Sequence, residues 1–181
     1  MSKITKKLEN VEIGKTFEVG GVEFIKFPSG ADGQTVAVAK DIAFRSAYGK
    51  TNNLDKSDIL KKLNKDFLPG IIAAVGEENV CEFETDLTTL DGLKTYGTMT
   101  LKVSLPTLDF YRANVEIFDK YNPDTWWWLA TPFSAEPHYT NCYWVECVAP
   151  SGLIDDYGFS NIYGVRPLLI FVSDISVSCE E

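Results

Sequence analysis

Helical spacing of apolar residues is confined to the middle of this chain, and short strand-like segments lie on both sides of it. Residues 57–67 place their apolar side chains on one helical face and three lysines away from it. Pro69-Gly70 marks the predicted end of this helix. Residues 71–75 fit either a short helix or a buried strand, and residues 106–114 fit a short helix with proline in its first turn.

The strand-like segments are separated by glycine-rich and proline-rich turns. Gly20-Gly21, between residues 16–19 and 22–27, is typical of a hairpin. Further strand-like patterns cover residues 35–39, 80–84, 98–105, 126–129, 140–148 and 165–172. Strands at both ends of the chain with helices between them predict an α+β fold. We expect a single compact domain over residues 1–181, with a twisted antiparallel sheet and two or three short helices.

The chain of 181 residues fits one domain that folds without a disulfide or metal, because a chain of this size buries roughly 70% of its unfolded surface. Residues 1–10 are polar, and no apolar run approaches the length of a membrane span. Four cysteines, mostly far apart, favour free thiols, although an even number does not exclude disulfides. We therefore expect a cytoplasmic protein without a membrane partner.

Negative charge is concentrated after residue 70. Residues 1–70 hold twelve Lys/Arg and nine Asp/Glu, whereas residues 71–181 hold five Lys/Arg and seventeen Asp/Glu. The acidic portion would be repelled by phosphate backbones, which disfavours direct binding of nucleic acid. It could be attracted to a basic protein surface, including one that normally holds nucleic acid. The alternative is that the charge only keeps the protein soluble.

The acidic residues nearest to one another in sequence are the candidates for such a binding surface. Glu82 and Glu84 would share one face of a strand, opposite Cys81 and Phe83. One interpretation is a solvated edge strand protected by charge. The other is a partner-binding surface that imitates the charge of nucleic acid, made of Glu77, Glu78, Glu82, Glu84, Asp86 and Asp91 and extended by Asp155 and Asp156.

Few residues could carry catalysis. His138 is the single histidine, which excludes a two-histidine metal site within the chain. Cys142 and Cys147 are an odd number of residues apart, so a strand would place them on opposite faces. Gly14-Lys15-Thr16 lacks the earlier glycine of a phosphate-binding loop, because Glu9 stands there. The sequence predicts no catalysis, no cofactor and no metal site, although metal binding by His138 and Cys142 stays open. A Cys–His nucleophilic pair would need proximity and an orienting third group, and no sequence feature supplies either.

Aromatic residues are densest after residue 125. In a strand, Trp126 and Trp128 share one face and Trp127 points the other way. Core packing of all three tryptophans is one interpretation. The other is that one is exposed, where tryptophan favours binding hot spots. Trp127 is the tryptophan that we assign to partner binding.

Three segments resemble a large bacterial and phage domain family of unknown function. Residues 127–132 (Trp-Trp-Leu-Ala-Thr-Pro) resemble its Trp-Trp-Leu-Arg-Ser-Pro motif. Residues 164–169 (Gly-Val-Arg-Pro-Leu-Leu) resemble its closing Gly-Val-Arg-Pro-Ala-Leu, and residues 57–67 resemble its Ser-x-x-Leu-Arg-x-x-Leu-Asn-x-x-Phe helix. Ala130-Thr131 replaces the Arg-Ser of the family, so a role for that arginine does not carry over.

That family is similar to C-type-lectin-like and sulfatase-modifying-factor domains, and the resemblance implies a compact α+β domain with a twisted antiparallel sheet. The reactive cysteine pair of the sulfatase-modifying enzymes has no counterpart in this sequence. Arg166, in the closing motif, is expected to be structural and to donate hydrogen bonds to carbonyls beneath the sheet.

Small, acidic, stand-alone chains are common among phage-encoded inhibitors of bacterial defence, and a fold resemblance does not settle function. An anti-CRISPR protein that blocks a Cas9-type nuclease fits these properties, because such nucleases carry basic channels for guide and target strands. We therefore expect a non-catalytic inhibitor that binds a protein partner with a basic nucleic-acid-binding surface. The alternative is a C-type-lectin-like recognition module that binds a glycan or a surface protein through exposed aromatic residues.

Overall fold

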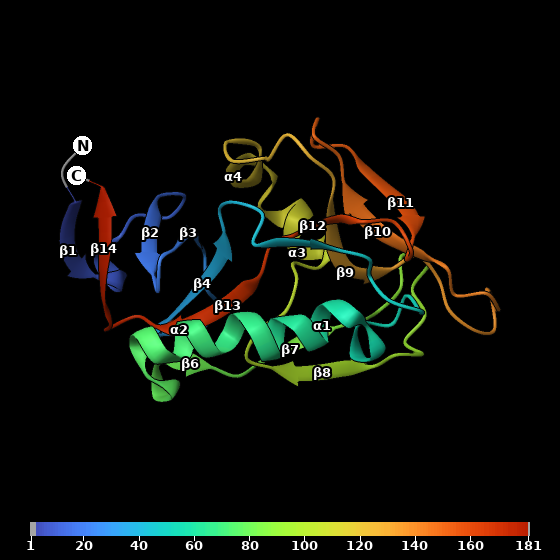
Figure 1. Ribbon diagram of the computed structural model, residues 1–181, viewed down its shortest axis with the longest axis horizontal. Helices are drawn as coiled ribbons and strands as arrows, with labels where there is room; N and C mark the ends of the chain where they lie inside the picture. Colours follow the sequence, from blue (N-terminus) through green and yellow to red (C-terminus); the bar gives the residue numbers. More distant parts are fainter. Residues whose placement is uncertain (1–2, 181) are drawn as a thin grey trace.

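A computed structural model describes residues 3–180 (Figure 1). Strands are distributed from one end of this range to the other, and helices occur mainly in its middle. The α-helices are α1 (Asp58–Lys62), α2 (Leu68–Val75), α3 (Leu108–Ala113) and α4 (Val115–Asp119). Four further helical segments are η1 (Leu8–Asn10), η2 (Leu54–Lys56), η3 (Leu63–Phe67) and η4 (Glu77–Asn79). The strands are β1 (Lys3–Lys7), β2 (Thr16–Val19), β3 (Val22–Phe27), β4 (Gln34–Ala39), β5 (Phe44–Ser46), β6 (Val80–Cys81), β7 (Phe83–Asp86), β8 (Thr98–Leu101), β9 (Trp127–Pro132), β10 (Trp144–Val148), β11 (Ile154–Gly158), β12 (Tyr163–Val165), β13 (Leu168–Val172) and β14 (Ser176–Glu180).

The strands form three sheets. A seven-stranded antiparallel sheet has the order β1-β14-β2-β3-β4-β13-β6 and curves as a half-barrel. A five-stranded sheet has the order β11-β10-β9-β12-β5, with β12 and β9 parallel and the other neighbours antiparallel. Strands β7 and β8 pair only with each other among the described residues. The chain is thus a mixed α+β single domain, as predicted, but with more than one sheet.

The predicted hairpin around Gly20-Gly21 is confirmed, because β2 and β3 pair in register on either side of it. Both glycines have positive φ, +60° and +79°, as a two-residue turn between twisted strands requires.

The central helix is longer than its sequence pattern predicts. Segments α1, η3 and α2 follow one another without a break and form one helix of 18 residues. The Ser57 hydroxyl caps its start by accepting a hydrogen bond from the Leu60 amide at 3.0 Å. Pro69 does not end the helix, because the preceding turn, η3, is π-helical. Such a turn accommodates the missing amide and the bulk of the proline ring.

Two apolar clusters lie on the two faces of the seven-stranded sheet. Side chains alternate along β4, with Ala37 and Ala39 facing the central helix and Val36 and Val38 facing α3 and α4. Side chains of strand β9 belong to both clusters, and the strand is buried along its whole length. This double packing joins the five-stranded sheet to the rest of the molecule.

Two predicted strands are each divided between sheets. Residues 80–84 separate into β6 and β7, which belong to different sheets, and Glu82 lies at the junction. Residues 165–172 separate into β12 and β13 at Arg166-Pro167, where the chain crosses from one main sheet to the other. Arg166 is fully buried at this crossing, and its Nε donates to the Ala39 carbonyl at 3.0 Å, as predicted. Its other two guanidinium nitrogens have no hydrogen-bond partner within residues 3–180, and the guanidinium instead lies 4.8 Å from the centroid of the Trp127 ring.

Candidate partner-binding site

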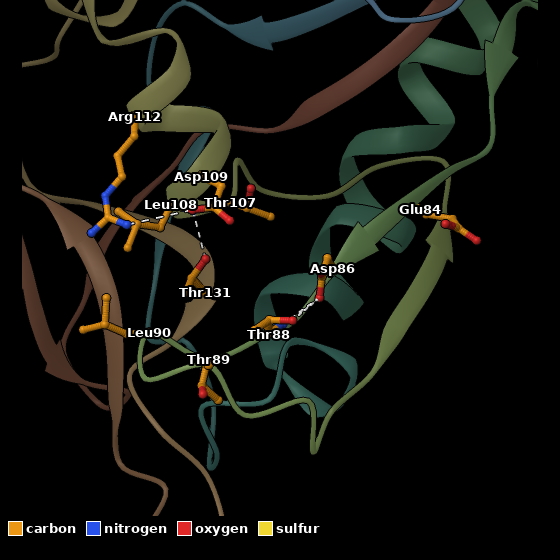
Figure 2. A pocket seen from close by; sticks show the side chains of 11 residues that line it. Glu84, Asp86, Thr88, Thr89, Leu90, Thr107, Leu108, Asp109, Arg112 and Thr131 are labelled. Atoms are coloured by element: carbon orange, nitrogen blue, oxygen red, sulfur yellow. Dashed lines mark hydrogen bonds and ion pairs between the residues drawn. The ribbon is translucent and has the colours of Figure 1, made fainter.

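A cavity of about 430 Å³ lies between β7 with its following loop on one side and α3 with β9 on the other. Figure 2 shows Glu84 and Asp86 on the β7 side, and Asp109, Arg112 and Thr131 across from them. Two of the predicted partner-binding carboxylates therefore lie at one cavity. Its lining residues are Glu84, Asp86, Thr88, Thr89, Leu90, Gly92, Thr107, Leu108, Asp109, Arg112 and Thr131.

Strand pairing positions the two carboxylates. In the β7–β8 register, Glu84 lies opposite Thr100 and Asp86 lies opposite Thr98. Because side chains alternate along a strand, Glu84 and Asp86 share one face and Thr85 between them is buried. The exposed face of β7 is thus the acidic one.

The opposite wall is held in place by two threonine hydroxyls. The Thr107 hydroxyl caps α3 by accepting a hydrogen bond from the Phe110 amide at 3.2 Å. The Thr131 hydroxyl, on β9, accepts one from the Leu108 amide at 2.9 Å. These bonds fix the start of α3, and with it Asp109 and Arg112, to the buried strand β9.

The charges of this cavity are only partly compensated. Arg112 lies 3.8 Å from Asp109 on the same helix. Asp86 accepts hydrogen bonds from the Thr88 hydroxyl and amide at 2.6 and 2.8 Å, and these bonds lower the pKa of its carboxyl. Within residues 3–180, neither Glu84 nor Asp86 forms an ion pair. The β7 wall therefore presents two anionic groups to the cavity.

Asp91 has a different environment from the other predicted carboxylates. It accepts hydrogen bonds from the hydroxyls of Thr89 and Ser134, at 2.5 and 2.7 Å, and contacts His138 Nδ1 at 3.0 Å. The Thr89 bond makes the largest contribution to lowering the pKa of Asp91 to about 2. Asp91 thereby joins the loop after β7 to the segment after β9, so its carboxylate oxygens are already engaged within the chain.

The remaining acidic positions do not line this cavity. Glu77 and Glu78 lie in η4, where Glu77 pairs with Lys102 at 2.9 Å. Glu82 is exposed at the junction of β6 and β7. Asp155 and Asp156 are half-buried on β11, which lies well apart from β7 in Figure 1. The structure thus brings Glu84 and Asp86 together but does not assemble all eight carboxylates into one surface.

Asp155 and Asp156 instead lie beside a buried carboxyl that the sequence analysis missed. Glu146 on β10 pairs with Asp156 in the sheet register, and its side chain is 2% exposed. Burial, with the nearby charge of Asp156, raises the pKa of Glu146 to about 7, and the Arg112 charge opposes the rise. A glutamate flanked by Val145 and Cys147 was the available sequence signal.

Trp127 is not accessible to a partner in this structure, which corrects the prediction made for it. Its side chain is fully buried against Phe118 and Tyr111, with ring centroids 5.6 and 5.8 Å away. Its indole Nε1 donates to Asn122 at 3.0 Å. The strand β9 lies between the two apolar clusters, so both of its faces are covered. Trp144, at 36%, is instead the exposed tryptophan.

His138, Cys142 and Cys147, which were considered for catalysis, each have a different environment. His138 contacts Asp91, and the Cys142 thiol donates to the Tyr139 carbonyl at 3.1 Å. Cys147 is buried, and burial raises the pKa of its thiol. Within the described part of the chain, no group of three or more histidine, cysteine, aspartate or glutamate side chains is placed to hold a metal ion.

Of the helices that the structure describes, none is long and apolar enough to cross a membrane. Comparisons of the chain with protein-family models, with curated proteins and with solved structures found no match.

Proposed function

We propose that this protein is a non-catalytic inhibitor that binds a basic, nucleic-acid-binding surface of a protein partner through its acidic β7 face. The observation that carries the proposal is the pair Glu84 and Asp86, two carboxylates that line a cavity and form no ion pair within residues 3–180. An anionic surface beside a concave site favours a cationic partner group and speeds its association.

The partner that we propose to test first is a guide-loaded Cas9-type nuclease, so that the protein would act as a phage anti-CRISPR in the host cytoplasm. Such nucleases hold their nucleic acids in positively charged channels. The net charge of −9, concentrated after residue 70, complements a channel of this kind. Inhibition would then require only that the protein occupies this channel, without a chemical step.

Reversing charge on the β7 face tests this proposal. We expect Glu84→Lys with Asp86→Lys to weaken binding to the guide-loaded nuclease by at least about tenfold at physiological salt, because these two charges act through the long-range field of the β7 face. Both side chains are exposed, so folding should be preserved. Binding is measured by surface plasmon resonance over a series of salt concentrations, and inhibition by DNA cleavage.

The matched control is Glu116→Lys with Asp124→Lys, which changes the net charge equally at exposed positions outside the cavity. Equal weakening by both double variants would mean that only total charge matters. Unchanged inhibition by the β7 variant would contradict the proposed mechanism.

A second proposal concerns the finer class of the fold. We propose a C-type-lectin-like relationship, in which the protein is a recognition module for a glycan or a surface protein. The exposed Trp144, packed edge-on against Tyr143 at 5.3 Å, is the observation that favours it. Loss of partner binding in Trp144→Ala, with no effect of the β7 charge reversal, would favour this second function over the first.

A further inference from the structure

Strand β7 has a free edge. It is paired with β8 on one side, in a sheet of two strands. Along the rest of the described chain, no main-chain group outside that pair forms a hydrogen bond with the main chain of Phe83–Asp86. A strand edge with unpaired amides and carbonyls is a template for the addition of another strand.

Two cavities border this strand. Glu84 and Asp86 line the cavity of about 430 Å³ already described. Phe83, Glu84 and Thr85 line a second cavity of about 180 Å³. No residue of β8 lines either cavity. Figure 2 shows the open space between β7 and the wall formed by α3 and β9.

The two cavities differ in chemistry. The first is acidic on its β7 wall, through Glu84 and Asp86. The second is mainly apolar, with walls contributed by Leu105, Phe110, Leu168 and Ile170. Thr85, which lines the second cavity, is 3% exposed, and its hydroxyl has no hydrogen-bond partner within residues 3–180. A main-chain amide or carbonyl of an added strand would satisfy this hydroxyl, whereas its apolar side chains would fill the rest of the cavity.

The alternation along β7 defines the kind of ligand that fits. Side chains of an added strand point alternately to the two faces of the sheet, as those of β7 itself do. Every second side chain would therefore meet the acidic wall, and those between would meet the apolar cavity. A segment with alternating basic and apolar residues matches both the acidic wall and the apolar cavity.

We propose that β7 accepts an extended segment of the partner protein as an added strand, with basic side chains directed to Glu84 and Asp86 and apolar side chains directed to the cavity beside Phe83 and Thr85. The inference rests on the proposed function, since it names the segment that the acidic face recognises. Main-chain hydrogen bonds supply affinity in this mode of binding, and the two cavities supply specificity.

The test uses a capped peptide of sequence Arg-Val-Arg-Val-Arg-Val, titrated into the isotope-labelled full chain and followed by NMR. We expect the largest shifts at the amides of residues 83–86. Two control peptides separate strand addition from charge attraction. One carries the same residues as Arg-Arg-Arg-Val-Val-Val, and the other is the alternating peptide with every second amide methylated. The methylated peptide should bind at least about tenfold more weakly, as expected for the loss of one or two hydrogen bonds. The Arg-Arg-Arg-Val-Val-Val peptide should also bind at least about tenfold more weakly, because its arginines and valines no longer alternate between the two faces.

A charge-reversed protein, Glu84→Lys with Asp86→Lys, should lose binding of the alternating peptide, while Glu116→Lys should retain it. The peptide controls do not depend on whether that variant folds. Equal binding of the methylated peptide, shifts centred away from β7, or no shift at about 1 mM peptide would each overturn strand addition.

Competition separates this inference from the proposed function. If the nuclease binds the protein and the alternating peptide does not compete, strand addition fails and the acidic-face mechanism stands. If the peptide binds at β7 but the nuclease is not bound, the proposed partner is wrong and the peptide site stands.

Discussion

At the scale of single residues, Glu146 lies in an environment that disfavours its charged form. Its carboxyl is buried, one oxygen has no hydrogen-bond partner among the described residues, and Asp156 faces it in the adjacent strand. Each feature disfavours the charged form, which is why the pKa of Glu146 is raised to about 7 from the ordinary value of 4.5. The folded protein therefore binds a proton at this position more tightly than the unfolded chain does.

The pH dependence of stability follows from this difference. Below about pH 4.5 the carboxyl is protonated in both states, and between about 4.5 and 7 the folded state holds the extra proton, so stability falls as pH rises through this window. We expect Glu146→Gln to match the wild type at about pH 4 and to exceed its unfolding free energy by about 3 kcal/mol at about pH 8. Urea unfolding at a series of pH values measures this difference.

Glu84→Gln, at an exposed position, is the matched control and should change stability by no more than about 0.5 kcal/mol at either pH. If the difference in unfolding free energy between Glu146→Gln and the wild type does not grow with pH, Glu146 is not a buried carboxyl that binds a proton in this range.

At the scale of elements, Asp91 joins two loops that meet beside the cavity. The loop after β7 is held to the segment after β9 by the contacts of Asp91 with Ser134 and His138, and by the Leu90 amide on the Pro132 carbonyl at 2.9 Å. The pKa of Asp91, about 2, lies below its ordinary value of 3.8. The contribution of this carboxylate to stability is therefore present above about pH 3.8 and is lost as pH falls through about 2.

Asp91→Asn should loosen this junction without unfolding the protein. We expect the amides of Leu90 and Leu93 to exchange hydrogen about tenfold faster, because charge-assisted hydrogen bonds become weaker, neutral ones. Hydrogen exchange followed by mass spectrometry or NMR measures this change. Asp109→Asn, an exposed substitution on the opposite cavity wall, should leave the two amides unaffected. Unchanged exchange in Asp91→Asn would show that the loops are held by other contacts.

The elements were predicted unevenly from sequence. The hairpin at Gly20-Gly21 and the start of the central helix at Ser57 depend on neighbouring residues, and both are confirmed. The end of that helix was predicted at Pro69-Gly70 and lies instead at Val75, because a π-helical turn and packing on the sheet outweigh the local effect of proline. The division of residues 80–84 between two sheets has no local signal.

At the scale of the whole molecule, the two main sheets share their apolar clusters. Trp128 and Val145, from the five-stranded sheet, belong to the same cluster as Phe17 and Phe171 from the seven-stranded sheet. We expect the protein to unfold in one cooperative transition, because neither sheet can lose its core while the other keeps it. Tryptophan fluorescence reports mainly on the five-stranded sheet, and far-ultraviolet circular dichroism reports on all elements.

The two signals should give coincident transitions in urea. Two separate midpoints would show that the sheets unfold independently and would contradict the single-domain organisation.

The sequence by itself determined the α+β fold class, the hairpin at Gly20-Gly21 and the start of the central helix at Ser57. It predicted Glu82 and Glu84 on one strand face, whereas the structure places Glu84 and Asp86 there. Only the tertiary structure decided that Trp127 is buried and that Glu146 lies in the interior. It also decided that β7 is separate from the seven-stranded sheet and has a free edge beside two cavities. The physical reason is that the periodic pattern of apolar residues, which predicts helices and strands, is set by residues close together in sequence. Burial depends on which layers cover each face of a strand, and those layers come from segments far apart in sequence.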